Sequence, residues 1–261
     1  MPELPEVEAY RVLAESALRR PVSGVDAPDG WFLKGGIDAS AVSAALSGRS
    51  LTAARRRGKL LLLDTSGDGP VLGLRFGMTG RLVVDGRAGV DRLLYSSDQG
   101  LSAWDRFAVQ FADGGDLRVH DPRRLGGVFL DPDEGRLGVD ALTITPAALR
   151  SALARSTAPL KARLMDQARL AGVGNLLADE TLWRAGLDPR RPAGGLTPAE
   201  LRRLHRHLRG SVADLIERGG SHSGDLMPAR AAGGVCPRDG AELSRATVGG
   251  RTTWWCPKHQ R

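Results

Sequence analysis

The distribution of apolar residues divides the chain into a β-rich part and a helical part. Near the N-terminus, Val7, Tyr10, Val12, Leu13 and Leu18 recur at roughly helical spacing, which predicts one leading helix. Short apolar or alternating runs follow, separated by glycine, aspartate and proline: KLLLLDT, PVLGLRFGM, RLVVDG, LLYSSD, RFAVQFADGGDLRVHD and GGVFLDP. Runs of this kind are typical of antiparallel strands joined by tight turns. We predict that residues 1–135 form a domain of sandwich or barrel type.

From about residue 143 the apolar residues adopt helical periodicity. The runs are TPAALRSALARS, PLKARLMDQ, NLLADETLWRAG and TPAELRRLHRHLRGSVADLIERGG. Thr145 and Thr197 each precede a proline and are predicted helix N-caps, while Gly186 and Gly219 are predicted helix ends. Residues 143–222 therefore form a separate helical domain in this prediction. The fold class is α+β multi-domain, with an N-terminal antiparallel β-sandwich and its leading helix placed first.

The C-terminal segment 231–261 carries both cysteines of the chain, in CPRDGAELSRATVGGRTTWWCPKHQR. Cys236 and Asp239 repeat the spacing of Cys256 and His259. Two such knuckles separated by a β-hairpin can direct four side chains at one tetrahedral ion, as in a zinc ribbon. Carboxylate is an infrequent ligand in closed structural zinc sites, so two interpretations stand. One structural Zn²⁺ is held by these four side chains, which we favour, or a metal-free hairpin packs around its two adjacent tryptophans.

Composition narrows the class of protein. The chain has 261 residues, of which 41% are hydrophobic, enough to build sizeable cores. It has no apolar run long enough to span a membrane, and its N-terminus lacks the basic and then apolar order of a signal peptide, so we expect a cytosolic protein. A structural disulfide is not expected in that compartment. The formal charge of +7 favours a polyanionic partner, as in ribosomal, membrane-surface and DNA-binding proteins.

The opening, MPELPEVE, has a chemical interpretation as well as a structural one. Removal of Met1 would leave Pro2 as a secondary amine, which can serve as a nucleophile. The same segment can be an extended lead into a helix with an acidic first turn. Three further motifs bear on this choice: RRRGKLLLL, HDPRRLG and LMDQARLAGVGNLLADE. Together with the opening and the tail, in this order along the whole chain, they resemble the formamidopyrimidine-DNA glycosylase and endonuclease VIII family of base-excision repair enzymes.

The resemblance implies a bifunctional enzyme that removes an oxidised base from double-stranded DNA and cleaves the strand by β,δ-elimination. It assigns Pro2 as the nucleophile that forms a Schiff base and Glu3 as the general acid/base. Glu6 would support either group, or else be a first-turn helix charge. Lys59, otherwise part of a solvated basic run, would lie near the phosphates of the abasic site and assist β-elimination. Arg251, in the hairpin, would grip a phosphate and assist δ-elimination.

Further positions carry the DNA contacts that the resemblance implies. The segment RLAGVGNLLADE resembles the helix-two-turn-helix element of the family, which would make residues 143–222 a DNA-binding domain, although it can also be an ordinary glycine-rich connection between helices. In that element Gly172 and Gly174 allow tight turns, and Asn175 would reach a phosphate at the start of a helix. The gap left by the extruded base would be filled by Met78, Arg123 and Leu125, although methionine and leucine are also ordinary core residues; Arg124 and Lys161 complete the set of DNA contacts.

The sequence departs from the family pattern at several points. Leu125 stands where phenylalanine is usual, which makes a smaller wedge between bases. Trp104 stands where the formamidopyrimidine branch often has histidine. The stretch between Gly220 and Cys236 is short for the branch that folds a long loop over the flipped base. The opening therefore favours one branch and the missing loop the other, which leaves oxidised purine and oxidised pyrimidine substrates both open.

Two other functions compete with the enzyme. A non-catalytic protein that binds damaged DNA would keep the fold and the basic surface, and an RNA-binding or ribosome-associated zinc-ribbon protein would share the tail and the charge. The presence of Pro2, Glu3 and Lys59 favours the enzyme, because a protein that only binds needs no N-terminal nucleophile. We expect a monomer associated with a bacterial nucleoid, with no membrane partner.

Overall fold

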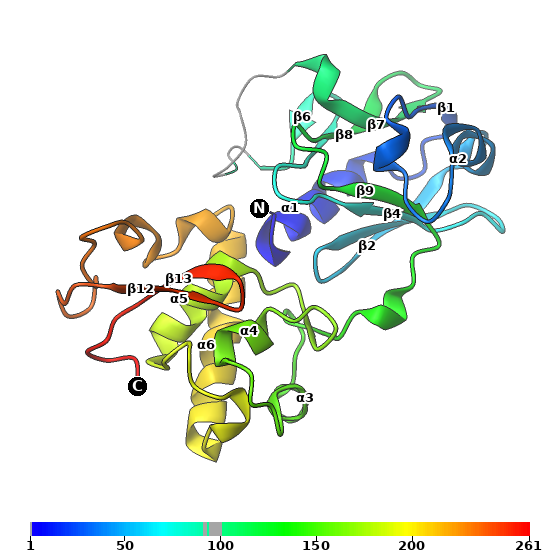
Figure 1. Cartoon of the computed structure of the whole chain (residues 1–261). Helices are drawn as coiled ribbons and strands as arrows, with labels where there is room; N and C mark the ends of the chain where they lie inside the picture. The colour runs from blue at the N-terminus through cyan, green and yellow to red at the C-terminus, as the bar shows by residue number, and fades with distance from the viewer. Residues whose placement is uncertain (1, 91–92, 94–100) are drawn as a thin grey trace. The chain divides into compact units, whose positions relative to one another are not determined.

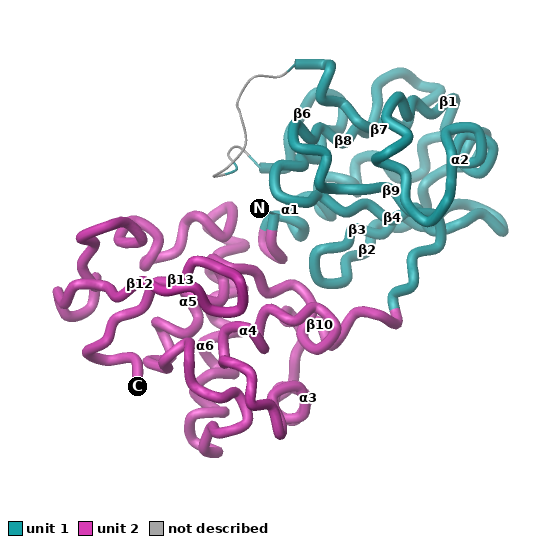
Figure 2. Tube along the Cα trace, viewed as in Figure 1, with its two compact units in different colours: residues 1–2, 6–134 teal, residues 3–5, 135–261 magenta. Residues whose placement is uncertain are grey.

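The computed structural model describes residues 2–90, 93 and 101–261 (Figure 1). It divides into two compact units (Figure 2): residues 1–2 and 6–134 form unit 1, and residues 3–5 and 135–261 form unit 2. Unit 2 contains both the helical region and the C-terminal hairpin, so the division into domains 1–135, 143–222 and 231–261 stays a prediction. The expected strand LLYSSD lies, apart from Leu93, outside the described residues.

In its described residues, unit 1 contains two antiparallel sheets, with strand orders β1-β7-β8-β5-β6 and β2-β3-β4-β9. The strands are β1 (Val22–Asp26), β2 (Leu51–Arg57), β3 (Leu60–Thr65), β4 (Leu72–Arg75), β5 (Arg81–Val84), β6 (Arg87–Ala88), β7 (Asp105–Phe111), β8 (Asp116–His120) and β9 (Gly127–Leu130). They are accompanied by helix α1 (Leu4–Ala14), whose first residues belong to unit 2, and by helix α2 (Ala39–Leu46). The predicted β-sandwich with a leading helix is confirmed.

The core of unit 1 follows from the alternation of apolar residues. Phe107, Val109 and Phe111 of β7 are buried, as the period of two in a strand requires. From α1, Tyr10 is fully buried and its ring centroid lies 4.5 Å from that of Phe76. Burying each such side chain contributes about 1.5–3 kcal/mol to folding.

The elements between residues 19 and 58 were not predicted from the sequence. Helix α2 buries only Val42 and Leu46, so its periodic signal is short, although Asp38 caps it by accepting a hydrogen bond from the Ala41 N–H at 2.8 Å. In β2 only Leu51 is buried, and the run TAARRR shows no alternation of apolar and polar residues. Both elements are fixed by tertiary packing, which a local pattern does not contain.

Unit 2 is mainly helical. Its helices are α3 (Pro146–Leu153), α4 (Leu160–Leu164), α5 (Asn175–Ala185) and α6 (Pro198–Glu217), and the short strands β10 (Val139–Asp140) and β11 (Leu170–Ala171) pair in parallel. Strands β12 (Ser244–Val248) and β13 (Arg251–Trp255) form the C-terminal hairpin that the sequence predicted. Among the described residues, no helix is both long enough and apolar enough to cross a membrane.

The predicted helix signals are found where the sequence placed them. Thr145 Oγ1 accepts a hydrogen bond from the Ala148 N–H at 3.1 Å at the start of α3. Thr197 and Glu200 form a reciprocal capping box at the start of α6. Gly186 ends α5 in the left-handed conformation, with φ 64°. These signals are local, which is why the sequence alone revealed them.

Candidate active site

In unit 1, the loop between β8 and β9 is folded around one buried carboxylate, that of Asp121. This carboxylate accepts hydrogen bonds from the backbone N–H groups of Arg123 at 3.2 Å, Leu125 at 2.9 Å and Gly126 at 2.9 Å. It also accepts one from Thr79 Oγ1 at 2.6 Å. Hydrogen bonds to a buried charged group are among the stronger ones in proteins, so they fix the turn. The side chain of Leu125 is left half exposed.

The loop between β4 and β5, which carries Met78, packs directly on the Asp121 loop. A Cβ atom on Gly77 would lie 2.4 Å from the backbone carbonyl carbon of Leu125, so the two loops touch backbone to backbone. Gly77 also has a φ of 56°, a conformation that favours glycine. The same loop is also held by helix α1, because the Tyr10 hydroxyl donates a hydrogen bond to the carbonyl of Gly80 at 3.1 Å. The predicted partners Met78 and Leu125 therefore lie on two loops that are in contact.

Lys59 lies in the two-residue turn between β2 and β3, directly before the strand that the sequence predicted. The preceding arginines are not a solvated run. Arg55 Nη2 lies 2.8 Å from Asp64, and Arg56 forms an ion pair with Glu8 at 2.8 Å. Arg56 also donates a hydrogen bond to the carbonyl of Gly58 at 2.9 Å, which holds the turn. Arg56 thus helps to hold the turn that carries Lys59.

The register of the four-stranded sheet brings these three loops to one end of it. Leu60, which begins β3, pairs with Arg75, which ends β4. Arg75 in turn pairs with Gly127, which begins β9. The Lys59 turn, the Met78 loop and the Asp121 loop all leave the sheet at this end, so Lys59, Met78 and the residues Arg123, Arg124 and Leu125 share one edge of unit 1.

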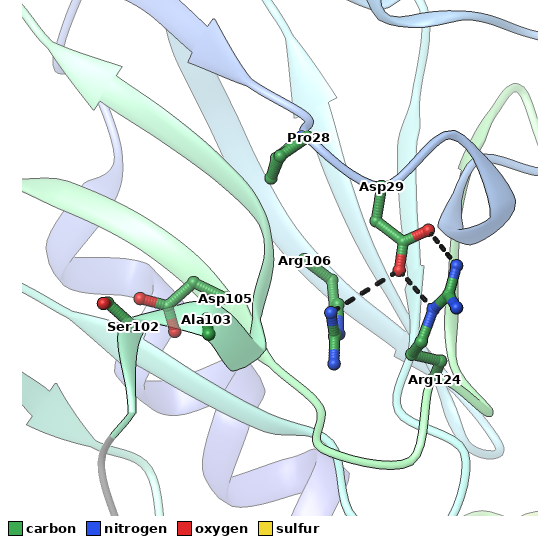
Figure 3. A pocket seen from close by; sticks show the side chains of 7 residues that line it. All are labelled: Pro28, Asp29, Ser102, Ala103, Asp105, Arg106 and Arg124. Atoms are coloured by element: carbon green, nitrogen blue, oxygen red, sulfur yellow. Dashed lines mark hydrogen bonds and ion pairs between the residues drawn. The ribbon is translucent and has the colours of Figure 1, made fainter.

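A hollow of about 520 Å³ lies beside the Asp121 loop (Figure 3). It is lined by Pro28, Asp29, Ser102, Ala103, Asp105, Arg106 and Arg124. Arg124 contacts Asp29 with two nitrogens, each at 2.6 Å, and Arg106 lies 3.8 Å from the same carboxylate. The hydrogen bonds from Arg124 lower the pKa of Asp29. Arg124 is thereby held in an ion pair although its side chain is half exposed.

In unit 2, Glu3 is buried at the N-terminus of α5. Its carboxylate accepts hydrogen bonds from the N–H groups of Leu176 at 2.9 Å and Leu177 at 3.0 Å, and only 1% of the residue is exposed. Free N–H groups at the start of a helix favour a negative charge there. A Cβ atom on Gly174 would lie 2.1 Å from Glu3 Cδ, so only glycine leaves room for this carboxylate.

Asn175 is the first residue of α5, as predicted. Its Oδ1 atom is buried and has no hydrogen-bond partner among the described residues. Arg251 is exposed at the start of β13, next to the hairpin turn, and donates a hydrogen bond to the carbonyl of Gly250 at 3.2 Å. Glu6 and Pro2 belong to unit 1 and both are buried.

Lys161 differs from the prediction that it contacts DNA. Its side chain is fully buried, and its Nζ atom lies 2.7 Å from Asp179 Oδ1. An ammonium group enclosed in this way cannot touch a phosphate from its position in the structure. Burial lowers the pKa of Lys161, while Asp179 acts in the opposite direction.

The four predicted metal ligands come together in unit 2. The ligand atoms of Cys236, Asp239, Cys256 and His259 all lie within 4.8 Å of one another, so this group could hold a metal ion. His259 Nδ1 lies 2.8 Å from Asp239 Oδ2, and this contact lowers the pKa of the carboxyl. The indole N–H of Trp183 donates a hydrogen bond to Cys236 Sγ at 3.3 Å, a contact from outside the group that orients one of its sulfurs.

Comparisons with known proteins agree along the chain. The family model described as formamidopyrimidine-DNA glycosylase N-terminal domain matches residues 1–128, and the model described as formamidopyrimidine-DNA glycosylase H2TH domain matches residues 137–226. A formamidopyrimidine-DNA glycosylase from Stenotrophomonas maltophilia is 35% identical over 288 residues, which cover 100% of both chains. One from Chloroflexus aggregans is 34% identical over 280 residues, which cover 98% of both. The chain belongs to the formamidopyrimidine-DNA glycosylase family.

Solved structures of the formamidopyrimidine-DNA glycosylase family share the fold. A complex of the LlFpg protein with a THF-DNA and an inhibitor matches with a TM-score of 0.84 and 25% identity, covering 100% of both chains. A complex of the Lactococcus lactis enzyme with Fapy-dG-containing DNA matches with a TM-score of 0.83 and 25% identity, covering 99% of this chain and 100% of the other. The predicted family and the predicted α+β fold class are therefore confirmed.

Sequence reasoning missed three residues that organise the site. Asp121 was visible only as the aspartate of HDPRRLG, Asp29 as part of a turn, and Asp179 as a polar position in a helix. Asp29 and Asp179 pair with side chains far away in the chain, and Asp121 joins its own loop to Thr79, 42 residues away. A buried aspartate next to an arginine-rich motif is a signal for such a role, but only the structure identifies its partners.

Proposed function

We propose that this chain is a DNA glycosylase with abasic-site lyase activity that removes oxidised bases from double-stranded DNA through Pro2. The observation that carries the proposal is the match to formamidopyrimidine-DNA glycosylases over the full length of the chain, with Pro2 and Glu3 at its start. Structures in the family contain Lactococcus lactis enzymes bound to DNA with Fapy-dG, an oxidised pyrimidine or an abasic site. We extend these damaged-DNA partners to this chain.

The chemistry begins at the secondary amine of Pro2, once Met1 is removed. α-Amino groups have a pKa near ~8, so a fraction is unprotonated at neutral pH. The lone pair of the nitrogen attacks C1′ of the damaged nucleotide, and the glycosidic bond breaks with its electron pair leaving on the base. Opening of the sugar ring, with proton exchange through Glu3, gives an iminium between Pro2 and C1′.

The iminium makes strand cleavage feasible because it acidifies the adjacent carbon. Loss of a proton from C2′ expels the 3′ phosphate, and a second elimination expels the 5′ phosphate. Lys59 and Arg251 would balance the charge of these phosphates. Water then hydrolyses the remaining Schiff base and frees Pro2. Glu6, buried in α1, would support the N-terminal groups.

The DNA contacts would come from exposed loops. Arg123, Leu125 and Met78 would fill the gap left by the extruded nucleotide, since the Asp121 turn fixes the loop that carries the first two. Arg124 would contact a phosphate only in exchange for Asp29. Asn175 would offer its amide to a phosphate at the start of α5.

For the metal, we propose one structural Zn²⁺ held by Cys236, Asp239, Cys256 and His259. Two sulfurs, an imidazole and a carboxylate, all within 4.8 Å of one another, are a ligand set that a tetrahedral ion accepts. The ion would tie the two ends of the hairpin segment together and would take no part in the reaction. We further propose that the protein acts as a monomer in the cytoplasm, at the nucleoid.

The proposal is tested with duplexes that contain a formamidopyrimidine-dG, an oxidised pyrimidine or a preformed abasic site. We expect base release followed by strand cleavage with at least one of the first two duplexes, and strand cleavage at the preformed abasic site. Glu3→Gln should slow base release more than cleavage of the abasic site, because a preformed abasic site no longer needs protonation of a leaving base. Binding to all three duplexes without any cleavage would show a non-catalytic damage-binding protein instead.

A further inference from the structure

A cluster of buried charges in unit 2 lies between the helices and the C-terminal hairpin. Lys161 of α4 and Asp179 of α5 are fully buried and form an ion pair at 2.7 Å. The second carboxylate oxygen of Asp179 accepts hydrogen bonds from Arg230, whose Nη2 lies 2.8 Å away and whose side chain is 6% exposed. Three charged side chains are thus enclosed together, which is costly unless each is fully paired.

Lys161 and Asp179 also form hydrogen bonds with strand β13. Lys161 Nζ donates to the carbonyl of Thr252 at 3.2 Å and to Thr253 Oγ1 at 2.8 Å, in addition to its ion pair with Asp179. Asp179 Oδ2 accepts a hydrogen bond from the Trp254 N–H at 3.4 Å. The cluster therefore forms hydrogen bonds with three consecutive residues in the middle of one strand.

The cluster reaches Arg251 through one hydroxyl. Thr253 is fully buried, and its Oγ1 atom, which accepts from Lys161, donates to the carbonyl of Arg251 at 3.0 Å. The hairpin turn is fixed from the same side, because a Cβ atom on Gly249 would lie 2.7 Å from Ala162 Cβ, next to Lys161 in α4. A continuous chain of contacts leads from Asp179 to the backbone of the arginine at the hairpin tip.

We propose that Lys161, Asp179 and Thr253 are positioning residues that set the hairpin, and with it Arg251, on the helical part of unit 2. This anchor is separate from the metal group, whose ligands lie before β12 and after β13. The metal would hold the ends of the segment while the buried cluster holds its tip. Lys161 serves DNA binding indirectly, through the residue it places. The inference rests on the proposed function for the role of Arg251, but not for the anchoring itself.

The test uses Thr253→Val, which removes the hydroxyl while keeping the size of the side chain. Thr252→Val is the matched control, because the Thr252 side chain is exposed and only its carbonyl belongs to the cluster. Thr253→Ser restores the hydroxyl. We expect Thr253→Val to lower the ratio of δ- to β-elimination product roughly tenfold, about the effect of one lost hydrogen bond. The Thr252→Val and Thr253→Ser ratios should stay near that of the wild type, and bound metal should be equal in all four proteins.

An unchanged product ratio in Thr253→Val would overturn the proposal. Amide hydrogen exchange without DNA gives a second readout that does not depend on catalysis. After removal of metal by a chelator, the amides of Thr252 and Trp254 should stay protected in the wild type and lose protection in Asp179→Asn. Loss of their protection on chelation alone would show that the metal, and not the cluster, holds the tip. If the wild type cleaves no substrate, the proposed function fails, while the exchange experiment still decides on the anchor.

Discussion

Replacement of Gly174 by alanine should displace Glu3 without disturbing the helix that follows. Gly174 has a φ of −116°, which alanine adopts freely, so the substitution adds no backbone strain. The added Cβ would lie 2.1 Å from Glu3 Cδ and 2.4 Å from its Oε1 atom. Contacts this short are forbidden, and the carboxylate must leave the position in which it accepts two N–H groups of α5.

The magnitude follows from the bonds that are lost. Hydrogen bonds to a charged group contribute about 1.5–3 kcal/mol each, so the loss of both amounts to about 3 kcal/mol at the lower end. If Glu3 exchanges protons from this position, a loss of that size slows base release roughly a hundredfold. Cleavage of a preformed abasic site should fall much less, because no base has to leave.

Single-turnover measurements on the damaged and the abasic duplex separate the two steps. Gly210→Ala is the matched control: it also adds one methyl group, but into open space within α6, where alanine is expected to stabilise the helix by about 1 kcal/mol. Base release by Gly174→Ala within about threefold of the wild-type rate, with a folded protein, would refute the assigned place of Glu3 in the reaction.

Three further predictions concern binding, metal and stability. DNA affinity should fall steeply with salt, with a log–log slope of about −0.9 for each phosphate that Lys59, Arg123 or Arg251 neutralises, and a nearly flat titration would contradict these contacts. Elemental analysis of protein purified without added metal should find about one zinc per chain, held less tightly than by four cysteines, and full activity with far less zinc would show that the hairpin needs none. Glu200, whose pKa a hydrogen bond from Arg191 lowers to about 2, should stabilise unit 2 fully above pH 4.5 and progressively less as the pH falls towards 2; thermal unfolding of Glu200→Gln should lack this part of the acid dependence, and an unchanged profile would contradict it.

Local signals in the sequence predicted the local parts of the fold. Thr145 and Thr197 could be predicted as helix caps because each hydroxyl bonds to an N–H group only three residues later, and a proline follows at the first helical position. The spacing of Cys236, Asp239, Cys256 and His259 predicted a cluster that the structure forms. The resemblance to the family supplied the assignment of Pro2, which no pattern in the opening could supply.

Hydrogen-bond and ion-pair partners that are distant in the chain could not be predicted from the sequence. Glu3 bonds to Leu176, 173 residues away, and a carboxylate near the N-terminus gives no sign of which helix it caps. Nothing in the local sequence distinguishes Lys161 from a surface lysine, and only the packing of α4 and α5 shows that it is buried against Asp179. The arginines of β2 looked like a solvated run because Glu8 and Asp64, which pair with them, are separate in sequence.

Borohydride trapping with abasic-site DNA tests most directly the claim that the amine of Pro2 is the nucleophile. Reduction converts the iminium into a stable amine, so the wild-type protein should form a covalent complex whose crosslinked peptide begins at Pro2. A variant that retains one additional residue before Pro2 has an amide in place of the amine and should give no complex through this position, while still binding the same DNA. Undiminished trapping by that variant, or a crosslink mapped to a lysine in the wild type, would contradict the account.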